Sequence, residues 1–313
     1  MKSTVSIFLR SLLLLSFFLA PLLVQTPAAQ EQAPAFLQQG LQLMREGKLD
    51  EALALYRRTL QTSPLSEPAN IAAGIVLDFM GQGEDARKYF AKAIDVADTP
   101  EHKAVAQRGM AISYAFEGNC EKAVEFERHV LDYSVSVNNL FQQGEIADEA
   151  ARVCLDSGDL DAAYHWYQLG RDSGLKELNI TPARRDLWDF RWENAQARIA
   201  ARRGNQGEAQ KHTAAAKAIL DKGTNPEQAP FLPSLQAYVS FYSKDYKSAL
   251  DQFQKANQND PFIQCMLAQT YENLGDKNKA IEFYRKASTT VSHNPPAAYA
   301  VPLSKKKLAV PSK

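Results

Sequence analysis

The stretch Gly47-Lys48-Leu49-Asp50-Glu51-Ala52-Leu53-Ala54-Leu55-Tyr56 sets out a frame that the chain repeats along most of its length. In this frame a turn glycine is followed five residues later by alanine, and an aromatic residue comes four residues after the alanine. Glycine favours the end of one helix and the residues after it favour the next, so each copy predicts two helices joined by a tight turn. Further copies, which together predict a repeat array, begin at Gly81, Gly118, Gly158, Gly204, Lys244 and Gly275.

This frame resembles the tetratricopeptide repeat, whose period is 34 residues; Ala52 and Ala86, the alanines of the first two copies, are 34 residues apart. The resemblance implies an all-α fold, a right-handed superhelical solenoid of antiparallel helix pairs, with about seven irregular repeats in residues 30–292. The predicted repeats cover about 33–66, 67–100, 104–137, 144–177, 182–223, 230–260 and 261–292.

Small and aromatic residues at fixed places predict how the pairs pack. A small residue late in the first helix, such as Gly40, and the alanine early in the second let the two helices approach closely. The aromatic residue fills the space against the next repeat, where full burial stabilises the fold by roughly 3 to 5 kcal/mol relative to alanine. Glu127 in the third copy and Thr213 in the fifth replace it, so looser packing is expected there. The predicted core aromatics are Tyr56, Phe90, Tyr167, Phe253 and Tyr284.

Two interruptions and a tail complete the chain. Thr181-Pro182 indicates an N-cap followed by a first-turn proline, which opens a long helix predicted over residues 183–203. Residues 223–230 are interpreted as a bend, because the two repeats after them are too few for a stable stack. Residues 293–313 form a tail with several prolines and Lys305-Lys306-Lys307. The proline spacing argues against a full capping helix, so the tail is expected to lie over the last repeat or to be disordered.

Residues 1–29 are predicted to be a secretory signal peptide. Lys2 and Arg10 precede an apolar run over residues 12–24, and small residues follow at 26–29. The run falls short of the roughly 20 apolar residues that span a bilayer. We therefore expect cleavage and export to the periplasm or the outside of the cell, with no membrane span in the mature chain. A protein tethered to the membrane by an uncleaved segment is the alternative.

The composition argues against nucleic-acid binding and against catalysis. The chain has 36 basic and 36 acidic residues, so no net positive field attracts a polynucleotide. The sequence has no HExxH, GxSxG or phosphate-loop motif, and its 5 histidines are scattered without metal-ligand spacing. We expect a non-enzymatic protein with no metal site and no cofactor. An enzyme with scattered polar residues near 188–203 is a less favoured alternative.

The resemblance also implies where a partner binds, because this family binds peptides or protein segments in the concave groove lined by the first helix of each pair. An acidic segment would suit the arginines in the middle of that groove, and arginine and tyrosine dominate binding hot spots. In the alternative interpretation the arginines form solvated salt bridges, which contribute little stability. The predicted groove residues are Arg108, Arg152, Asn194, Arg198, Arg202, Tyr238, Phe241 and Tyr242.

The chain has 3 cysteines, too few for a disulfide scaffold, and no CxxC pair. Cys120 falls at the start of the second helix of the third repeat, and Cys154 falls near the end of the first helix of the fourth. Neighbouring helices run antiparallel, so these two ends could meet in a disulfide. Two buried thiols are the alternative.

A second functional hypothesis is self-association, or a part in assembling the cell envelope. Repeat arrays need polar caps at their ends, and the sequence shows no obvious cap after Tyr284. The open end of the array, or the basic tail, would then make the contact.

Overall fold

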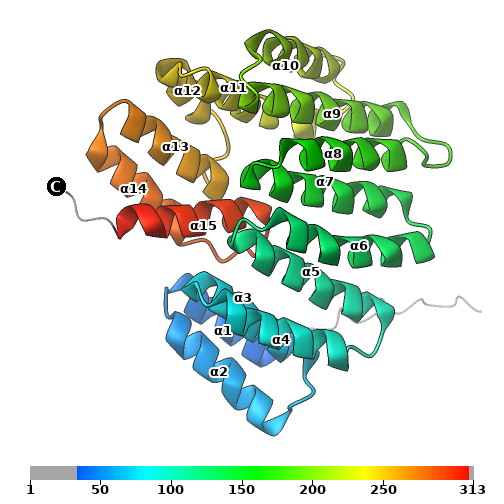
Figure 1. The fold of residues 1–313 in the computed structure, drawn as a ribbon, viewed down its shortest axis with the longest axis vertical. Helices are drawn as coiled ribbons and strands as arrows, with labels where there is room; N and C mark the ends of the chain where they lie inside the picture. The colour runs from blue at the N-terminus through cyan, green and yellow to red at the C-terminus, as the bar shows by residue number, and fades with distance from the viewer. Residues whose placement is uncertain (1–33, 310–313) are drawn as a thin grey trace, which may run out of the picture. The chain divides into compact units, whose positions relative to one another are not determined.

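The structure is a computed structural model that describes residues 34–309, so the predicted signal peptide lies outside the described residues. Residues 34–309 form fifteen α-helices and one short 3₁₀ helix, and they contain no strand. Figure 1 shows the helices stacked as successive antiparallel pairs. The predicted all-helical solenoid is therefore confirmed for this part of the chain.

The helices α1 to α14 form consecutive pairs, one for each predicted repeat. Within the described residues these pairs are α1 (Ala35–Arg45) with α2 (Leu49–Thr62), α3 (Glu67–Met80) with α4 (Gly83–Val96), α5 (Pro100–Phe116) with α6 (Cys120–Ser136), α7 (Leu140–Ser157) with α8 (Leu160–Gly174), α9 (Pro182–Arg202) with α10 (Gln206–Leu220), α11 (Phe231–Tyr242) with α12 (Tyr246–Phe253), and α13 (Pro261–Asn273) with α14 (Lys277–Ser288). The 3₁₀ helix η1 (Pro226–Gln228) lies in the predicted bend before α11.

Capping residues set where the inner helices begin. The predicted N-cap Thr181 accepts a hydrogen bond from the backbone N–H of Arg184, and α9 has the predicted extra length, 21 residues. The third and fourth pairs begin earlier than predicted, because Thr99 and Asn139 cap α5 and α7. Each of these side chains satisfies a backbone N–H that the first turn leaves without an intrahelical partner.

The backbone explains why the frame begins with glycine. The backbone angle φ is 75° at Gly47, and it is positive at the first residue of every other copy as well. A side chain in this left-handed region crowds the following carbonyl and costs roughly 1–2 kcal/mol. In the sixth copy Lys244 takes this conformation, with φ 66°, so this turn carries strain that the glycine turns avoid.

The aromatic residues of the frame are buried as predicted, with at most 8% of their surface exposed at Tyr56, Phe90, Tyr167, Phe253 and Tyr284. Opposite Tyr56 and Phe90 the small residue is required by space. A Cβ at Gly40 would lie 2.0 Å from the hydroxyl oxygen of Tyr56, and a Cβ at Gly74 would lie 2.8 Å from the ring of Phe90. The ring thus occupies the position of the missing side chain.

The two departures from the frame have different outcomes. Glu127 is only 1% exposed, and burial, followed by the charge of Glu149, raises its pKa well above the ordinary value. Burial thus disfavours the charged form of the side chain that fills the aromatic place. Thr213 lines a hollow of about 400 Å³ between α10 and the α11–α12 pair. A hollow there is consistent with the loose packing expected of the smaller side chain.

The expectation that the tail forms no full helix is wrong, because Pro295–Leu308 form a helix, α15. The expectation that the tail lies over the last repeat is confirmed, because α15 packs on α13 and α14. Pro295 and Pro296 occupy its first turn, where a missing N–H costs nothing, and the Asn294 side chain accepts a hydrogen bond from the N–H of Ala297. Pro302 lies inside the helix and removes one backbone bond. Contacts with the rest of the array offset that loss.

The helix α15 packs on α13 and α14 and also reaches α5 and α7, as Figure 1 shows. Ala298 and Val301 join the hydrophobic core of the first repeats, while Tyr299 and Leu303 pack in the core of the last repeat. The last helix pair is thus covered. The expectation of an uncapped end after Tyr284 is wrong for the same reason.

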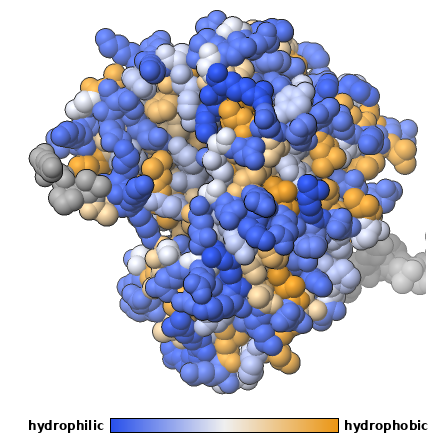
Figure 2. Space-filling model, in the orientation of Figure 1, coloured by the Kyte–Doolittle hydropathy of each residue, from blue (hydrophilic) through white to orange (hydrophobic). Residues whose placement is uncertain are grey.

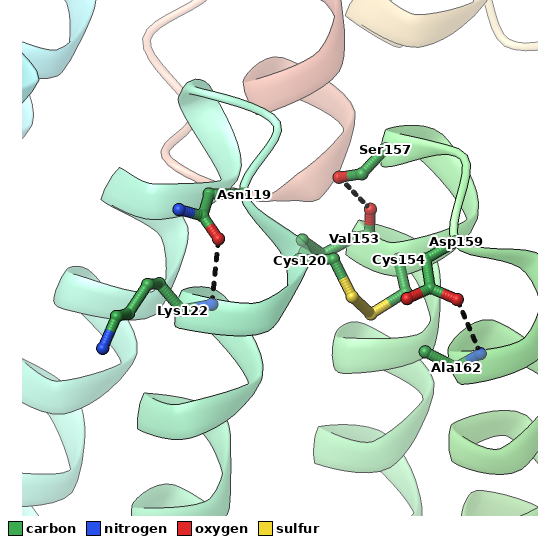
Figure 3. Close-up of a disulfide and its surroundings, with 8 residues drawn as sticks. All are labelled: Asn119, Cys120, Lys122, Val153, Cys154, Ser157, Asp159 and Ala162. Carbon is green, nitrogen blue, oxygen red and sulfur yellow. Dashed lines mark hydrogen bonds between the residues drawn. A yellow bond between two sulfur atoms is a disulfide. The ribbon is translucent and has the colours of Figure 1, made fainter.

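A disulfide joins α6 to α7. Figure 3 shows Cys120 at the start of α6 bonded to Cys154 near the end of α7, with Cα atoms 4.8 Å apart. Of the two arrangements that the sequence left open, the structure has the disulfide, and it links the third repeat to the fourth. The third cysteine, Cys265, is a buried free thiol in α13.

Candidate functional site

Five of the predicted groove residues lie together around one carboxylate. We call Arg152, Arg198, Arg202, Tyr238 and Tyr242, together with Asp156, the arginine–tyrosine cluster. The inner helices α7, α9 and α11 supply its residues. A single turn of α9 separates Arg198 from Arg202, so both guanidinium groups lie on the same face of that helix.

The cluster has more guanidinium groups than carboxylates. The Nε of Arg152 lies 2.6 Å from an oxygen of Asp156, and Nη2 of Arg198 lies 3.5 Å from its other oxygen. Arg202 donates a hydrogen bond of 3.0 Å to the backbone oxygen of Leu155. Within the described part of the chain, Nη2 of Arg152 is buried without a hydrogen-bond partner. The cluster therefore carries excess positive charge and a spare donor, which suit an anionic ligand.

Aromatic rings cover the guanidinium groups. The guanidinium carbons lie over three rings, Arg152 over Phe262 at 4.2 Å, Arg198 over Tyr238 at 4.6 Å and Arg202 over Tyr242 at 5.2 Å. Phe262 belongs to α13, and the ring of Tyr299 in α15 packs on it at 5.2 Å. Side chains from the far end of the array thus close over the middle of the predicted groove.

Two pKa shifts describe the charge state of the cluster. Burial and then the neighbouring Tyr238 raise the pKa of Tyr242 far above its ordinary value, so this side chain remains a neutral hydroxyl. Burial lowers the pKa of Arg202, but Tyr238 and Tyr242 outweigh that effect and raise it. Arg202 therefore stays cationic, as an anion-binding group must.

The remaining predicted residues have no contact with Asp156, although Phe241 touches the cluster through Tyr242. Arg108 donates to Glu149 across α5 and α7 at 2.7 Å, which leaves its charge paired. Phe241 packs edge-on against Tyr242 and Tyr246. Asn194 lines a hollow of about 240 Å³, together with Asp148, Tyr167, Phe190, Arg191, Ala195, Gln228 and Phe231.

Salt bridges within the array occupy several other arginines, as the alternative interpretation expected. Arg191 pairs with Glu145 and lies 3.7 Å from Asp148, and Arg171 lies 2.7 Å from Asp189. These pairs join α7 and α8 to α9. Their charges are already satisfied, so they are weaker candidates for ligand binding than the arginine–tyrosine cluster.

Residues 34–309 contain no group of three or more His, Cys, Asp or Glu side chains arranged to hold a metal ion. No helix in this part of the chain is long and apolar enough to cross a bilayer. Figure 2 shows apolar side chains in small groups among hydrophilic ones on the face in view.

The sequence did not single out three residues that shape the cluster. Asp156 pairs with two of its arginines, Phe262 lies beneath two of them, and Tyr299 covers Phe262. The spacing of Asp156 was a usable signal, because it follows Arg152 by four residues on one helix face. Phe262 and Tyr299 gave no local signal, since they reach the cluster from distant repeats.

This arrangement of paired helices and inner-face polar residues defines a helical-repeat protein. Models of the tetratricopeptide repeat match residues 43–109 and 263–289, so the chain carries tetratricopeptide repeats near both ends of the described array. A comparison with curated proteins finds no match.

Two solved structures with TM-scores of at least 0.50 show the same fold at low identity. The apo form of RapI has a TM-score of 0.51 and 15% identity, over 80% of this chain and 94% of that chain. A Rap protein complexed with competence and sporulation factor has a TM-score of 0.50 and 14% identity, over 88% and 75%. A tetratricopeptide repeat protein from Parabacteroides merdae has a TM-score of 0.49 and 13% identity, over 86% and 97%. Likeness at these identities shows the fold alone.

Proposed function

We propose that this protein is an exported, non-enzymatic adaptor that binds an acidic protein segment at the arginine–tyrosine cluster. The excess of guanidinium groups over carboxylates carries this proposal. Asp156 balances one of three arginine charges, and a buried guanidinium nitrogen of Arg152 has no partner in the described chain. A carboxylate from a partner would supply the missing acceptor through charge-assisted hydrogen bonds.

The repeat fold supports the protein-binding part of the proposal. Solenoids present extended inner surfaces on which partners bind, and the Rap protein of similar fold was solved with competence and sporulation factor bound to it. Export rests on the apolar run at residues 12–24 and the small residues after it. The mature chain would have its disulfide in an oxidising compartment, where such bonds persist.

The test is to measure binding of a fluorescein-labelled hexaglutamate peptide by fluorescence anisotropy. Arg202→Glu should weaken binding roughly tenfold or more, because it replaces an attraction with a repulsion at the centre of the site. Arg203→Glu is the matched control, since Arg203 is its sequence neighbour, is exposed and pairs with Asp161 outside the cluster. Arg198→Glu is unsuitable, because it would bury a carboxylate beside Asp156.

Three results would count against the proposal. The first is that wild type and Arg202→Glu bind the hexaglutamate peptide equally. The second is that Arg202→Glu and Arg203→Glu lose the same amount of binding, and the third is that wild type binds a hexalysine peptide as tightly as hexaglutamate. Circular dichroism of each variant at 222 nm would show that the helices are intact. Self-association remains the second hypothesis, and sedimentation of the mature protein would test it, although the covered end of the array removes its original physical argument.

A further inference from the structure

Polar bonds, together with the apolar packing of Ala298 and Val301, hold α15 to the first repeats. The Nε2 of His293 lies 2.8 Å from a carboxylate oxygen of Asp78 in α3, and the side chain of Asp78 is fully buried. Ser113 of α5 donates a hydrogen bond of 2.7 Å to the other carboxylate oxygen. The Nζ of Lys305 donates to the backbone oxygen of Phe79 at the end of α3. The contacts of His293 and Lys305 join residues more than 200 positions apart in the sequence.

The ring of His293 is also held by aromatic packing. It stacks on Phe116 at 5.4 Å and on Phe90 at 5.6 Å, and Phe79 lies edge-on at 6.3 Å. His293 directly precedes the N-cap of α15. One side chain thus fixes the start of the helix to the core of the second and third repeats.

Two hollows lie beside this contact. A hollow of about 270 Å³ lies between α15 and the C-terminal ends of α5 and α7, and a second of about 190 Å³ lies between α15, α3 and α5. Pro302 also removes a helical hydrogen bond, so α15 depends on its surroundings to remain helical. A helix that needs its contacts to remain helical can open separately from the repeats that surround it.

The helix α15 is connected to the arginine–tyrosine cluster through two residues. Tyr299 packs on Phe262, the ring beneath Arg152 and Arg198. Tyr299 and Asp156 also line the same 270 Å³ hollow. Movement of α15 away from the array would therefore uncover Phe262 and one side of Asp156.

We propose that α15 is a displaceable cover over the arginine–tyrosine cluster, held shut by the contacts of His293 and Lys305 with α3, and that it opens to admit the acidic ligand. This inference rests on the proposed function for the identity of the ligand. The opening itself follows from the contacts of α15 alone. Binding and opening are then coupled, since a ligand that binds the open state shifts the population toward it.

The first experiment is hydrogen exchange, measured by mass spectrometry on the full-length protein without ligand. In wild type, the amides of α15 should exchange at least roughly tenfold faster than those of α13 and α14, because α15 opens on its own. Lys305→Met should speed α15 exchange several-fold further and leave α9 unchanged. Lys306→Met is the matched control, because Lys306 is exposed and makes none of the contacts that hold α15 shut.

A second pair of variants tests the histidine contact. His293→Ala should speed α15 exchange, and His293→Gln should restore part of the protection, because glutamine can donate to Asp78. If α15 exchanges at the same rate as α13 and α14 in wild type and in Lys305→Met, it opens only with the whole array and the proposal is overturned.

The labelled hexaglutamate peptide then tests the coupling. Lys305→Met should bind the peptide more tightly than wild type by about the factor by which its α15 exchange rises. Saturating peptide should also speed α15 exchange in wild type. Equal affinity of Lys305→Met and wild type would refute the role of cover. If no variant binds the peptide, the proposed ligand is wrong, and the exchange rates still decide whether α15 opens alone.

Discussion

The carboxyl group of Asp148 makes the free energy of unfolding depend on pH, and the structure gives the sign and the size of this dependence. It lies on α7 beside the 240 Å³ hollow, with its side chain 21% exposed and 3.7 Å from Arg191. Burial, opposed by the charge of Arg191, raises its pKa from the ordinary value of 3.8 to about 7. A carboxyl whose folded pKa is raised stabilises the fold fully below its unfolded pKa. That contribution is lost as the pH rises through the folded pKa.

The pKa of Asp148 rises by about three units on folding, and each unit corresponds to about 1.36 kcal/mol. Between pH 4 and 9 this group therefore lowers the free energy of unfolding by at most about 4 kcal/mol. Asp148→Asn cannot ionise, so its free energy of unfolding should improve relative to wild type as the pH rises from 5 to 8.5. Urea unfolding followed by tryptophan fluorescence measures this locally, because the 3 tryptophans, Trp166, Trp188 and Trp192, lie on α8 and α9.

A second aspartate, Asp186 on α9, serves as a control, because its effect on the free energy of unfolding changes with pH in the opposite direction. A hydrogen bond from Lys222, with a further one from Thr224, lowers the pKa of Asp186, so its stabilising effect is present above the unfolded pKa and is lost as the pH falls. Asp186→Asn should therefore destabilise at pH 7 and less at pH 3. If wild type and Asp148→Asn differ in free energy of unfolding by the same amount at pH 5 and at pH 8.5, the reasoning is refuted.

Three further predictions concern the fold. Thiol titration of the denatured, unreduced protein should find one free thiol, Cys265, and three free thiols would contradict the disulfide. Gly144→Ala should destabilise by roughly 2 kcal/mol or more, because its Cβ would lie 2.3 Å from the buried ring of Trp188; Gly207→Ala, whose Cβ meets nothing closer than 3.9 Å, should be neutral or stabilising by up to about 1 kcal/mol in urea unfolding. Lys244→Gly should raise the unfolding midpoint by relieving roughly 1 kcal/mol of left-handed strain, and a lower midpoint would argue against strain at this turn.

Local sequence rules predicted the helix pairs because the information for them is local. A glycine with positive φ, a cap residue and a nearby proline each act within one turn of the chain. That is why Gly47 and Thr181 mark real helix boundaries. The buried aromatic places were predictable for a similar reason, since Tyr56 needs only the nearby Gly40 to make room for its ring.

The candidate site was predictable in its residue types and not in its arrangement. Helical spacing placed Arg198 and Arg202 on one face. It gave no means of knowing that Phe262 would reach Arg152 from three repeats away. That contact depends on how strongly the array curves, which is the sum of small rotations between repeats. Because the spacing between the repeats is irregular, this sum cannot be obtained from the sequence of one repeat at a time.

The wrong prediction that the tail forms no full helix bears on the proposed role of α15. The proline rule correctly assessed the intrinsic helical stability of residues 295–308, which is low because Pro302 breaks a backbone bond. The rule failed because α15 takes its stability from α3, α5 and α13 through His293, Lys305 and Tyr299. A segment that is helical only while docked couples loss of its contacts to loss of its helix. A cover that is either docked or released needs a low intrinsic helix propensity and stabilising contacts with distant parts of the chain. The helix α15 has both.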